Sequence, residues 1–153
     1  MKVYLDVCCL NRMFDDQLQD KVRLETEAIV SVLKRCADGE WLLVGSDIID
    51  IEVSKNPDAI KRQKVLLLHD GAAFKTKYNA DIKSRGEQFR RLGAKMFDSL
   101  HLASAEYADV DVFLTTDARL VKTAARSDIK IRVENPLNYY MEVLSHEQSG
   151  DKL

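Results

Sequence analysis

Short apolar runs of strand length alternate along the chain with longer segments that carry helical periodicity. Strands are predicted at Val3–Asp6, Trp41–Val44, Val112–Leu114 and Ile129–Val133. Helices are predicted over residues 18–37, around Glu52, over 58–70 and 79–92, around Asp98, and over 118–126 and 136–144. Because strands that alternate with helices tend to pair in parallel beneath those helices, the sequence predicts an α/β fold.

Four acidic residues stand where these elements end or begin. Asp6 closes the first apolar run and Asp117 follows the run that ends at Leu114, whereas Glu52 and Asp98 belong to helices. Open parallel sheets bind ligands beyond the carboxyl ends of their strands. Carboxylates gathered there repel one another unless a cation lies between them, and oxygen ligands favour hard ions such as Mg²⁺ or Mn²⁺. The pattern therefore predicts metal-assisted chemistry on a phosphate group.

Each of these acids, taken alone, also has an ordinary structural explanation. Asp6 is a residue type common in turns, and Asp117 is a residue type common as the N-cap of a following helix. Glu52 is spaced to pair with Lys55 on a helix surface, and Asp98 would favour a helix N-terminus through the macrodipole. The metal site is therefore predicted from the four positions together.

Positive charge is concentrated in the middle of the chain. Residues 55–95 contain eleven lysines and arginines but only four acids, whereas the whole chain has a net charge of −2. A metal-dependent nuclease needs such a basic segment beside its acidic centre, because the cations attract the polyanion and the acids hold the metal. A solvated helical face is the alternative explanation. The candidate RNA contacts in this segment are Lys61, Arg62, Lys64, Arg90 and Arg91.

The composition is that of one compact domain. With 153 residues, 46% of them hydrophobic, the chain can bury a core, and six glycines and two prolines leave little room for linkers. We predict a single domain over residues 1–145 and a polar, frayed tail over residues 146–153. Three cysteines, two of them adjacent, do not make a disulfide framework, and neither a signal peptide nor a membrane helix is expected. A cytoplasmic location is the expectation.

Several motifs together resemble those of the PIN-domain family. They are Tyr4-Leu5-Asp6, Ser46 followed six residues later by Glu52, the segment Phe97–Ala105 that contains Asp98, and Phe113–Asp117. The stretch 97–117 is the most specific, because an Asp-x-x-x-Leu-Ala helix and a Thr-Asp pair after a strand occur at the expected separation. The resemblance extends from about residue 2 to Val143. It departs from the family at Cys8, where many members carry Asn, and Asn11 lies further along.

The resemblance implies a PIN-like, three-layer α/β/α fold around a twisted parallel sheet. Bacterial members of the family include the VapC-type toxin ribonucleases of toxin–antitoxin pairs. The resemblance therefore implies cleavage of an RNA substrate that depends on Mg²⁺ or Mn²⁺, an antitoxin protein as partner, and a homodimer.

The resemblance also assigns roles to individual residues. The catalytic residues and metal ligands would be Asp6, Glu52, Asp98 and Asp117. The residues that would orient a water or a carboxylate are Thr116 and Ser46, with Asn11 as a candidate for the missing Asn at position 8.

Other interpretations of the site residues are less well supported. His101 lies three residues after Asp98, but a lone histidine on an anchored helix is more often a hydrogen-bonded packing residue than a metal ligand. A receiver-like signalling domain with acids around Mg²⁺ would have an acidic pair after its first strand, where this chain has Asp6 alone. A PIN-like domain that binds RNA or protein without cleaving would have lost an acid, and this chain keeps all four.

Overall fold

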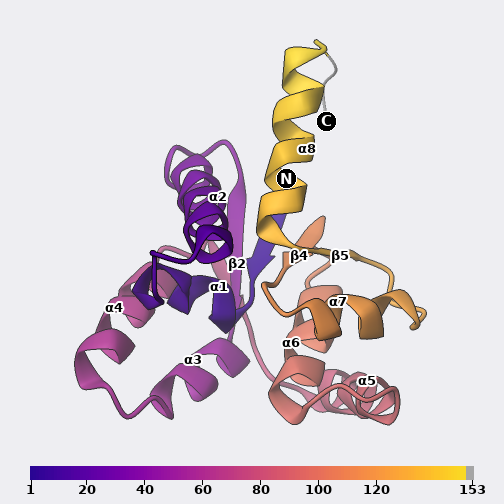
Figure 1. Cartoon of the computed structure of the whole chain (residues 1–153). Coiled ribbons are helices and arrows are strands. Elements are labelled where there is room, and N and C mark those ends of the chain that lie inside the picture. The colour runs from indigo at the N-terminus through magenta and orange to yellow at the C-terminus, as the bar shows by residue number, and fades with distance from the viewer. Residues whose placement is uncertain (151–153) are drawn as a thin grey trace.

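Five parallel strands form the central sheet in a computed structural model that describes residues 1–150 (Figure 1). The strands are β1 (Lys2–Leu5), β2 (Leu42–Ser46), β3 (Phe74–Thr76), β4 (Val112–Leu114) and β5 (Arg132–Glu134). They lie in the order β3-β2-β1-β4-β5, and every neighbouring pair is parallel. The predicted α/β class with a parallel sheet is confirmed.

Helices flank this sheet. They are α1 (Val7–Asn11), the short 3₁₀ helix η1 (Arg12–Phe14), α2 (Asp20–Ala37), α3 (Asp47–Ser54), α4 (Ala59–Asp70), α5 (Ala80–Arg91), α6 (Met96–Tyr107), α7 (Ala118–Ala125) and α8 (Pro136–Gln148). Helix α2 packs against α8, and α5 packs against α6. Figure 1 shows α3 and α4 gathered on one side of the strands and α5, α6 and α7 on the other. None of the helices within residues 1–150 combines the length and apolar character needed to cross a membrane.

The central strands are buried on both faces, as is usual for parallel sheets covered by helices. Every residue of Val3–Leu5 and of β4 is almost fully shielded from solvent. The rings of Tyr4 and Phe113 stack across β1 and β4 with their centroids 5.2 Å apart. Such continuous apolar burial explains why these two strands can be recognised in the sequence as short unbroken apolar runs.

The order in which strands are added to the sheet reverses at β1. The chain first adds β2 and β3 on one side of β1 and then places β4 and β5 on the other side. Leu5 pairs with Leu114, and the Asp6 amide donates to the Leu114 carbonyl at 3.0 Å, so the first residues beyond β1 and β4 lie side by side. Ligand sites of open parallel sheets occur at such reversal points.

The structure differs from the predicted elements at four places. Strand β3 was not predicted, and only its last residue, Thr76, is buried. Helix α1 begins directly after Asp6, where the sequence offered no recognisable turn. Strand β5 begins at Arg132, near the end of the predicted strand. Helix α8 is capped by Asn135 and continues to Gln148, so residues 146–148 of the predicted frayed tail are helical, and residues 151–153 lie outside the described part.

Candidate functional site

Asp6 is held rigidly at the end of β1. Its Oδ1 accepts a hydrogen bond from the Val7 amide at 2.8 Å and thereby caps α1. Its Oδ2 accepts from the Thr115 hydroxyl at 2.9 Å and from the Cys8 thiol at 3.3 Å. The side chain is almost fully buried. Asp6 therefore both caps α1 and belongs to the acidic site.

Glu52 reaches the same site from α3. Ser46, at the end of β2, caps this helix by accepting a hydrogen bond from the Ile49 amide at 3.2 Å. That cap turns the chain from the sheet into α3, whose second turn carries Glu52. The Glu52 side chain is about one-third exposed, and its Oε1 lies 2.6 Å from His101 Nε2. The structure thus brings Asp6 and Glu52 together around His101.

His101 is fully buried, and both of its ring nitrogens have partners. Nε2 lies 2.6 Å from Glu52 Oε1 and 3.8 Å from Asp6 Oδ1. Nδ1 lies 2.6 Å from the Tyr4 hydroxyl, which itself lies 2.6 Å from Ser46 Oγ. Burial raises the pKa of Tyr4 well above its ordinary value, so the phenol stays protonated. His101 is indeed a hydrogen-bonded buried histidine, but its carboxylate partners are Glu52 and Asp6 rather than Asp98.

The donor set at this point fits a divalent cation. Asp6, Glu52 and His101 each present one potential ligand atom, and these atoms all lie within 4.8 Å of one another. Within residues 1–150, neither Lys nor Arg forms an ion pair with Asp6, Glu52, Asp98 or Asp117. Several carboxylates thus converge without a basic side chain to neutralise them, a situation that a bound cation relieves.

Asp98 lies close enough to Asp6, Glu52 and Asp117 for their charges to act on its carboxyl group. Burial, followed by the charges of Asp6 and Asp117, raises the pKa of Asp98 from 3.8 to about 6. Asp117 caps α7 through Oδ1, which accepts from the Arg119 amide at 2.9 Å, and this leaves Oδ2 free of capping. The structure therefore gathers all four predicted acids at one end of the sheet, with Asp6 and Glu52 in the tightest cluster.

The hydroxyl that contacts Asp6 belongs to Thr115, one residue before the predicted Thr116. Thr115 Oγ1 donates to Asp6 and accepts from the Asp117 amide at 3.1 Å. The Thr116 amide donates to the Cys8 sulfur at 3.4 Å. Side chains alternate between the two sides of an extended chain, so only one of two adjacent threonines faces Asp6. No feature of the sequence identified which one.

Cys8 occupies the place beside Asp6 that the family resemblance reserved for Asn. Its sulfur lies 3.3 Å from both Asp6 Oδ2 and Thr115 Oγ1. Asn11 instead ends α1 and lines a cavity of about 260 Å³ together with Glu52. Asn11 Oδ1 is buried and has no hydrogen-bond partner within the described residues. Asn11 therefore sits next to Glu52 without bonding to any of the four acids.

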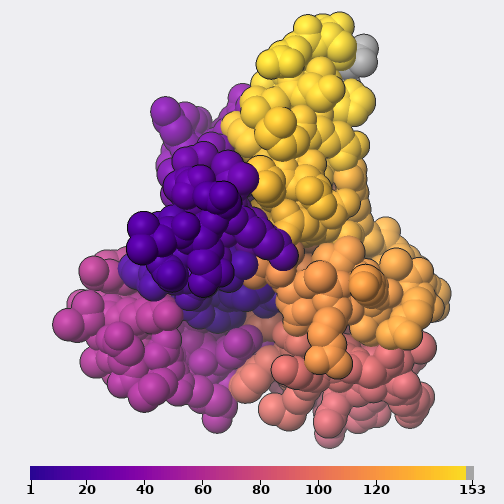
Figure 2. Space-filling model, viewed as in Figure 1, coloured from indigo at the N-terminus to yellow at the C-terminus, as the bar shows by residue number. Residues whose placement is uncertain are grey.

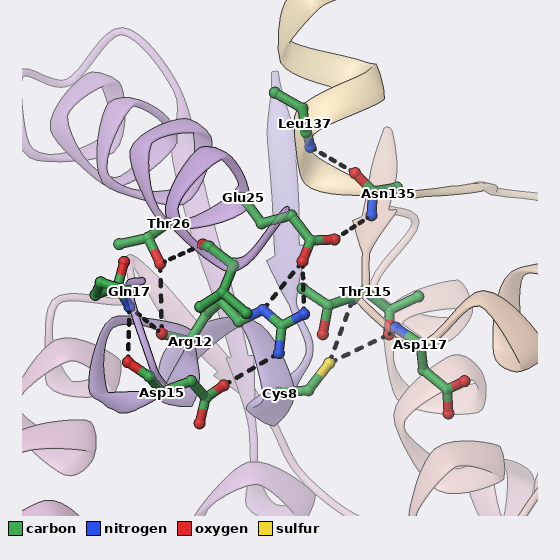
Figure 3. A network of polar contacts seen from close by, with 12 residues as sticks. Cys8, Arg12, Asp15, Gln17, Glu25, Thr26, Thr115, Asp117, Asn135 and Leu137 are labelled. Carbon is green, nitrogen blue, oxygen red and sulfur yellow. Dashed lines mark hydrogen bonds and ion pairs between the residues drawn. The ribbon is translucent and has the colours of Figure 1, made fainter. Parts of the chain in front are cut away.

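A second buried polar network lies directly beside the acidic site (Figure 3). The carboxylate of Glu25, on α2, is fully buried and accepts from Arg12 Nη2 at 2.6 Å and from Asn135 Nδ2 at 2.6 Å. Asn135 also caps α8 by accepting from the Leu137 amide at 2.8 Å. The network ties η1, α2 and the start of α8 together. This network could not be predicted from the sequence, because Glu25 and Asn135 are far apart along the chain.

A larger cavity, of about 600 Å³, opens next to Asp98 and Asp117. Its other charged lining residues are Lys95, Arg119, Lys122 and Arg126, all of them exposed. Figure 2 shows the orange surface of α7 adjoining the pink surface of α5 and α6 in this part of the molecule. None of the four cations forms an ion pair in the described part of the chain. A basic surface therefore adjoins the acidic site.

The basic residues predicted as RNA contacts lie elsewhere. Lys61 and Lys64, on α4, hold their ammonium groups 6.0 and 5.9 Å from the centre of the Phe14 ring. Arg62 donates to the Asn56 carbonyl at 2.7 Å. Arg90 and Arg91 are exposed in the last turn of α5. None of these five lines the cavity beside Asp98 and Asp117.

Comparison of the fold with solved structures identifies a similar chain in the crystal structure of VapBC2 from Rickettsia felis bound to a DNA fragment from their promoter. The two chains superpose with a TM-score of 0.59 at 16% sequence identity, over 88% of this chain and 98% of the other. The fold is PIN-like. No protein-family model and no curated protein matches the sequence. At this identity the PIN-like fold is shown, and the chemistry has to follow from the residues of the site.

Proposed function

We propose that this protein is a metal-dependent endoribonuclease, the toxin of a type II toxin–antitoxin pair. The observation that carries the proposal is the convergence of Asp6, Glu52 and His101 beyond the ends of the central strands, with Asp98 and Asp117 beside them and no Lys or Arg of residues 1–150 paired to these carboxylates. The PIN-like fold supports the same conclusion. Mg²⁺ or Mn²⁺ is the proposed cofactor, because carboxylate oxygens predominate among the ligands.

The chain's own residues would divide the work of phosphodiester cleavage. Asp6 and Glu52 would hold the cation, with Asp6 locked in place by Thr115 and the start of α1. A divalent ion held there supplies positive charge and Lewis acidity opposite the phosphodiester group. Asp98, which is partly buried beside Asp6 and Asp117, would accept the proton of the attacking water. The P–O3′ bond would break, the leaving 3′-oxygen would take a proton from water, and the products would carry 5′-phosphate and 3′-hydroxyl ends.

The unpaired cations beside the acids would bind the RNA backbone. Lys95, Arg119, Lys122 and Arg126 line the same cavity as Asp98 and Asp117. A phosphate chain laid along them would bring one phosphodiester group to the acids, and each neutralised phosphate adds salt-dependent affinity. Lys61, Arg62, Lys64, Arg90 and Arg91 stay candidates for a more distant part of the RNA.

The partner proposal depends on the structural neighbour. That neighbour is part of VapBC2 bound to promoter DNA, which supports an antitoxin protein as the partner of this chain. We further propose a cytoplasmic homodimer, as the family resemblance implies.

RNA cleavage by the purified protein tests the proposal. Mixed RNA substrates are incubated with Mn²⁺ or Mg²⁺, with and without EDTA, using the wild type, the double variant Asp6→Asn, Asp98→Asn, and the control Glu87→Gln on the exposed face of α5. We expect cleavage by the wild type and the control, and none with EDTA or the double variant. Asn at position 6 can still accept the α1 capping bond, so loss of activity would not report unfolding. A folded, metal-binding wild type that cuts no RNA would overturn the proposal in favour of a silent binding domain.

A further inference from the structure

His101 stands between the two principal carboxylates of the site. Its Nε2 lies 2.6 Å from Glu52 Oε1 and 3.8 Å from Asp6 Oδ1. Oxygen and nitrogen ligands at roughly 2.1 Å from one octahedral ion lie about 3 Å from one another. The two distances bracket that value. The three candidate ligand atoms lie within 4.8 Å of one another, so Nε2 is close enough to both carboxylates to bind an ion that they share.

The Tyr4 hydroxyl, which contacts Nδ1 of the His101 ring, can hydrogen-bond to either tautomer of the ring. With the proton on Nε2, His101 donates to Glu52 and Nδ1 accepts from the Tyr4 hydroxyl. With the proton on Nδ1, His101 donates to Tyr4, whose hydroxyl can in turn donate to Ser46 Oγ at 2.6 Å. Hydroxyl groups serve as donors or acceptors by rotating. The second arrangement frees the Nε2 lone pair for a cation and keeps the Nδ1 hydrogen bond.

We propose that His101 Nε2 is a direct ligand of the catalytic divalent ion, together with Asp6 and Glu52. This inference rests on the proposed function for the presence of the ion and assigns it a nitrogen donor in addition to carboxylate oxygens. Tyr4 and Ser46 are then positioning residues, since a histidine ligand usually donates its second N–H to a partner that fixes the ring.

A nitrogen ligand changes which ion the site prefers. Carboxylate and water ligands suit Mg²⁺ and Mn²⁺ alike, whereas imidazole favours transition-metal ions. The centre should therefore bind Mn²⁺ more tightly than Mg²⁺, and His101 should be the source of that preference.

Pulsed electron paramagnetic resonance on the Mn²⁺-loaded, unmodified chain tests the assignment directly. Electron spin echo envelope modulation detects nitrogen nuclei bonded to Mn²⁺. We expect ¹⁴N modulation in the wild type, replaced by the ¹⁵N pattern when the protein is made with ¹⁵N-labelled histidine alone. Bound Mn²⁺ without histidine nitrogen modulation would overturn the proposal and leave His101 as a hydrogen-bond donor to Glu52.

Variants then identify which histidine is responsible. The chain has three histidines; His69 is engaged by Asp50 and the Ser46 amide, and His146 lies on α8. His101→Gln should lose the nitrogen modulation and reduce the ratio of Mn²⁺ to Mg²⁺ affinity, as measured by calorimetric titration, whereas His146→Gln should change neither. Modulation that persists in a folded His101→Gln protein would also overturn the proposal.

The positioning role of Tyr4 has its own readout. Tyr4→Phe removes the Nδ1 partner and keeps the ring that stacks on Phe113. We expect about tenfold weaker Mn²⁺ binding with the nitrogen modulation retained, the usual effect of losing a partner behind a metal ligand. Unchanged Mn²⁺ affinity in Tyr4→Phe would contradict the positioning role assigned to Tyr4.

The failure of this inference can be told apart from failure of the proposed function. A wild type that binds no Mn²⁺ removes the metal centre and with it both proposals. Mn²⁺ binding with RNA cleavage but no nitrogen modulation removes only the ligand role of His101. Mn²⁺ binding with nitrogen modulation but no cleavage keeps the ligand role and removes the ribonuclease.

Discussion

Two carboxylate networks lie side by side at the carboxyl ends of the strands, and they handle negative charge differently. Glu25 is neutralised within the protein, because the Arg12 guanidinium donates to it twice, at 2.6 and 3.0 Å. Asp6 and Glu52 receive hydrogen bonds from Thr115, Cys8 and His101 but no basic side chain among residues 1–150 pairs with them. The Glu25 network contains its own positive charge, whereas Asp6 and Glu52 lack one and can bind a metal cation.

This difference separates structural from functional acids more sharply than burial does. Glu25 is more completely buried than Asp6, yet it is part of the scaffold. The observation that marks Asp6 and Glu52 is the missing counter-charge, because buried carboxylates otherwise pair with a cation or take up a proton.

The largest expected effect comes from breaking the self-neutralised network. Arg12→Ala leaves Glu25 buried without its counter-charge, so we expect the free energy of unfolding to fall by about 3 kcal/mol, the lower end for a broken buried pair because Arg12 is partly exposed. Arg23→Ala, which removes an exposed pair with Asp20, should cost less than about 1 kcal/mol. Urea denaturation measures both. Equal losses in the two variants would mean that the Glu25 network is no more important than a surface pair.

The second-largest expected effect is stabilisation by Mn²⁺ bound at the acidic site. Mn²⁺ at about one hundred times its dissociation constant should raise the free energy of unfolding of the wild type by about 2.7 kcal/mol. The double variant Asp6→Asn, Glu52→Gln should gain nothing, and Arg12→Ala should gain as much as the wild type. Urea denaturation with and without Mn²⁺ gives these differences. Stabilisation of the double variant would place the ion away from Asp6 and Glu52.

The basic residues of the two regions should differ in whether they are available to bind RNA. Arg12 is tied to Glu25, whereas Lys122 and Arg126 line the cavity without an ion pair in the described chain. In an Asp6→Asn background that cannot cut, Lys122→Glu with Arg126→Glu should weaken single-stranded RNA binding by about tenfold, and the salt slope should fall by roughly 0.7 for each lost phosphate contact.

The matched control for this binding experiment lies on α5. Arg90→Glu with Arg91→Glu introduces the same charge change in the segment predicted from the sequence. Filter binding at several salt concentrations compares the two pairs. A larger loss from the α5 pair would move the RNA path away from the cavity and onto the predicted basic segment.

The parts of the fold that sequence reasoning predicted are those fixed by local pattern. β1 and β4 could be predicted because they are buried on both faces and so appear as unbroken apolar runs. In the structure, Asp6 and Asp117 follow the carboxyl ends of these strands, beside the strand at which the sheet order reverses. Strand β3 could not be predicted in this way, because Phe74 and Lys75 are exposed on an edge strand and leave no apolar run.

The parts of the site that were missed are fixed by contacts across the fold. His101 meets Tyr4 and Glu52 across 97 and 49 residues of sequence, and Asn135 meets Glu25 across 110. No periodicity or spacing encodes such contacts, since each depends on how helices are placed over the sheet. A histidine three residues after Asp98 could therefore be noticed in the sequence, but its carboxylate partners could not be named.

The smallest expected effect concerns the charge on Asp98. Its pKa is raised from 3.8 to about 6 by burial and by Asp6 and Asp117, so the folded protein binds this proton more tightly than the unfolded chain does. The metal-free protein should therefore be more stable below about pH 4 and should lose stability as the pH rises to about 6 and beyond. Because the side chain is partly exposed, solvent screening should limit the loss to about 1 kcal/mol.

Asp98→Asn should flatten this part of the pH–stability curve measured by urea denaturation, whereas Glu87→Gln should keep it. Saturating Mn²⁺ should reverse the loss in the wild type, because the ion supplies the counter-charge that Glu25 obtains from Arg12. If Asp98→Asn leaves the slope unchanged, the charge of Asp98 is already compensated within the fold. Asp98 would then resemble Glu25 rather than Asp6. The proposed metal site would consist of Asp6, Glu52 and His101 alone.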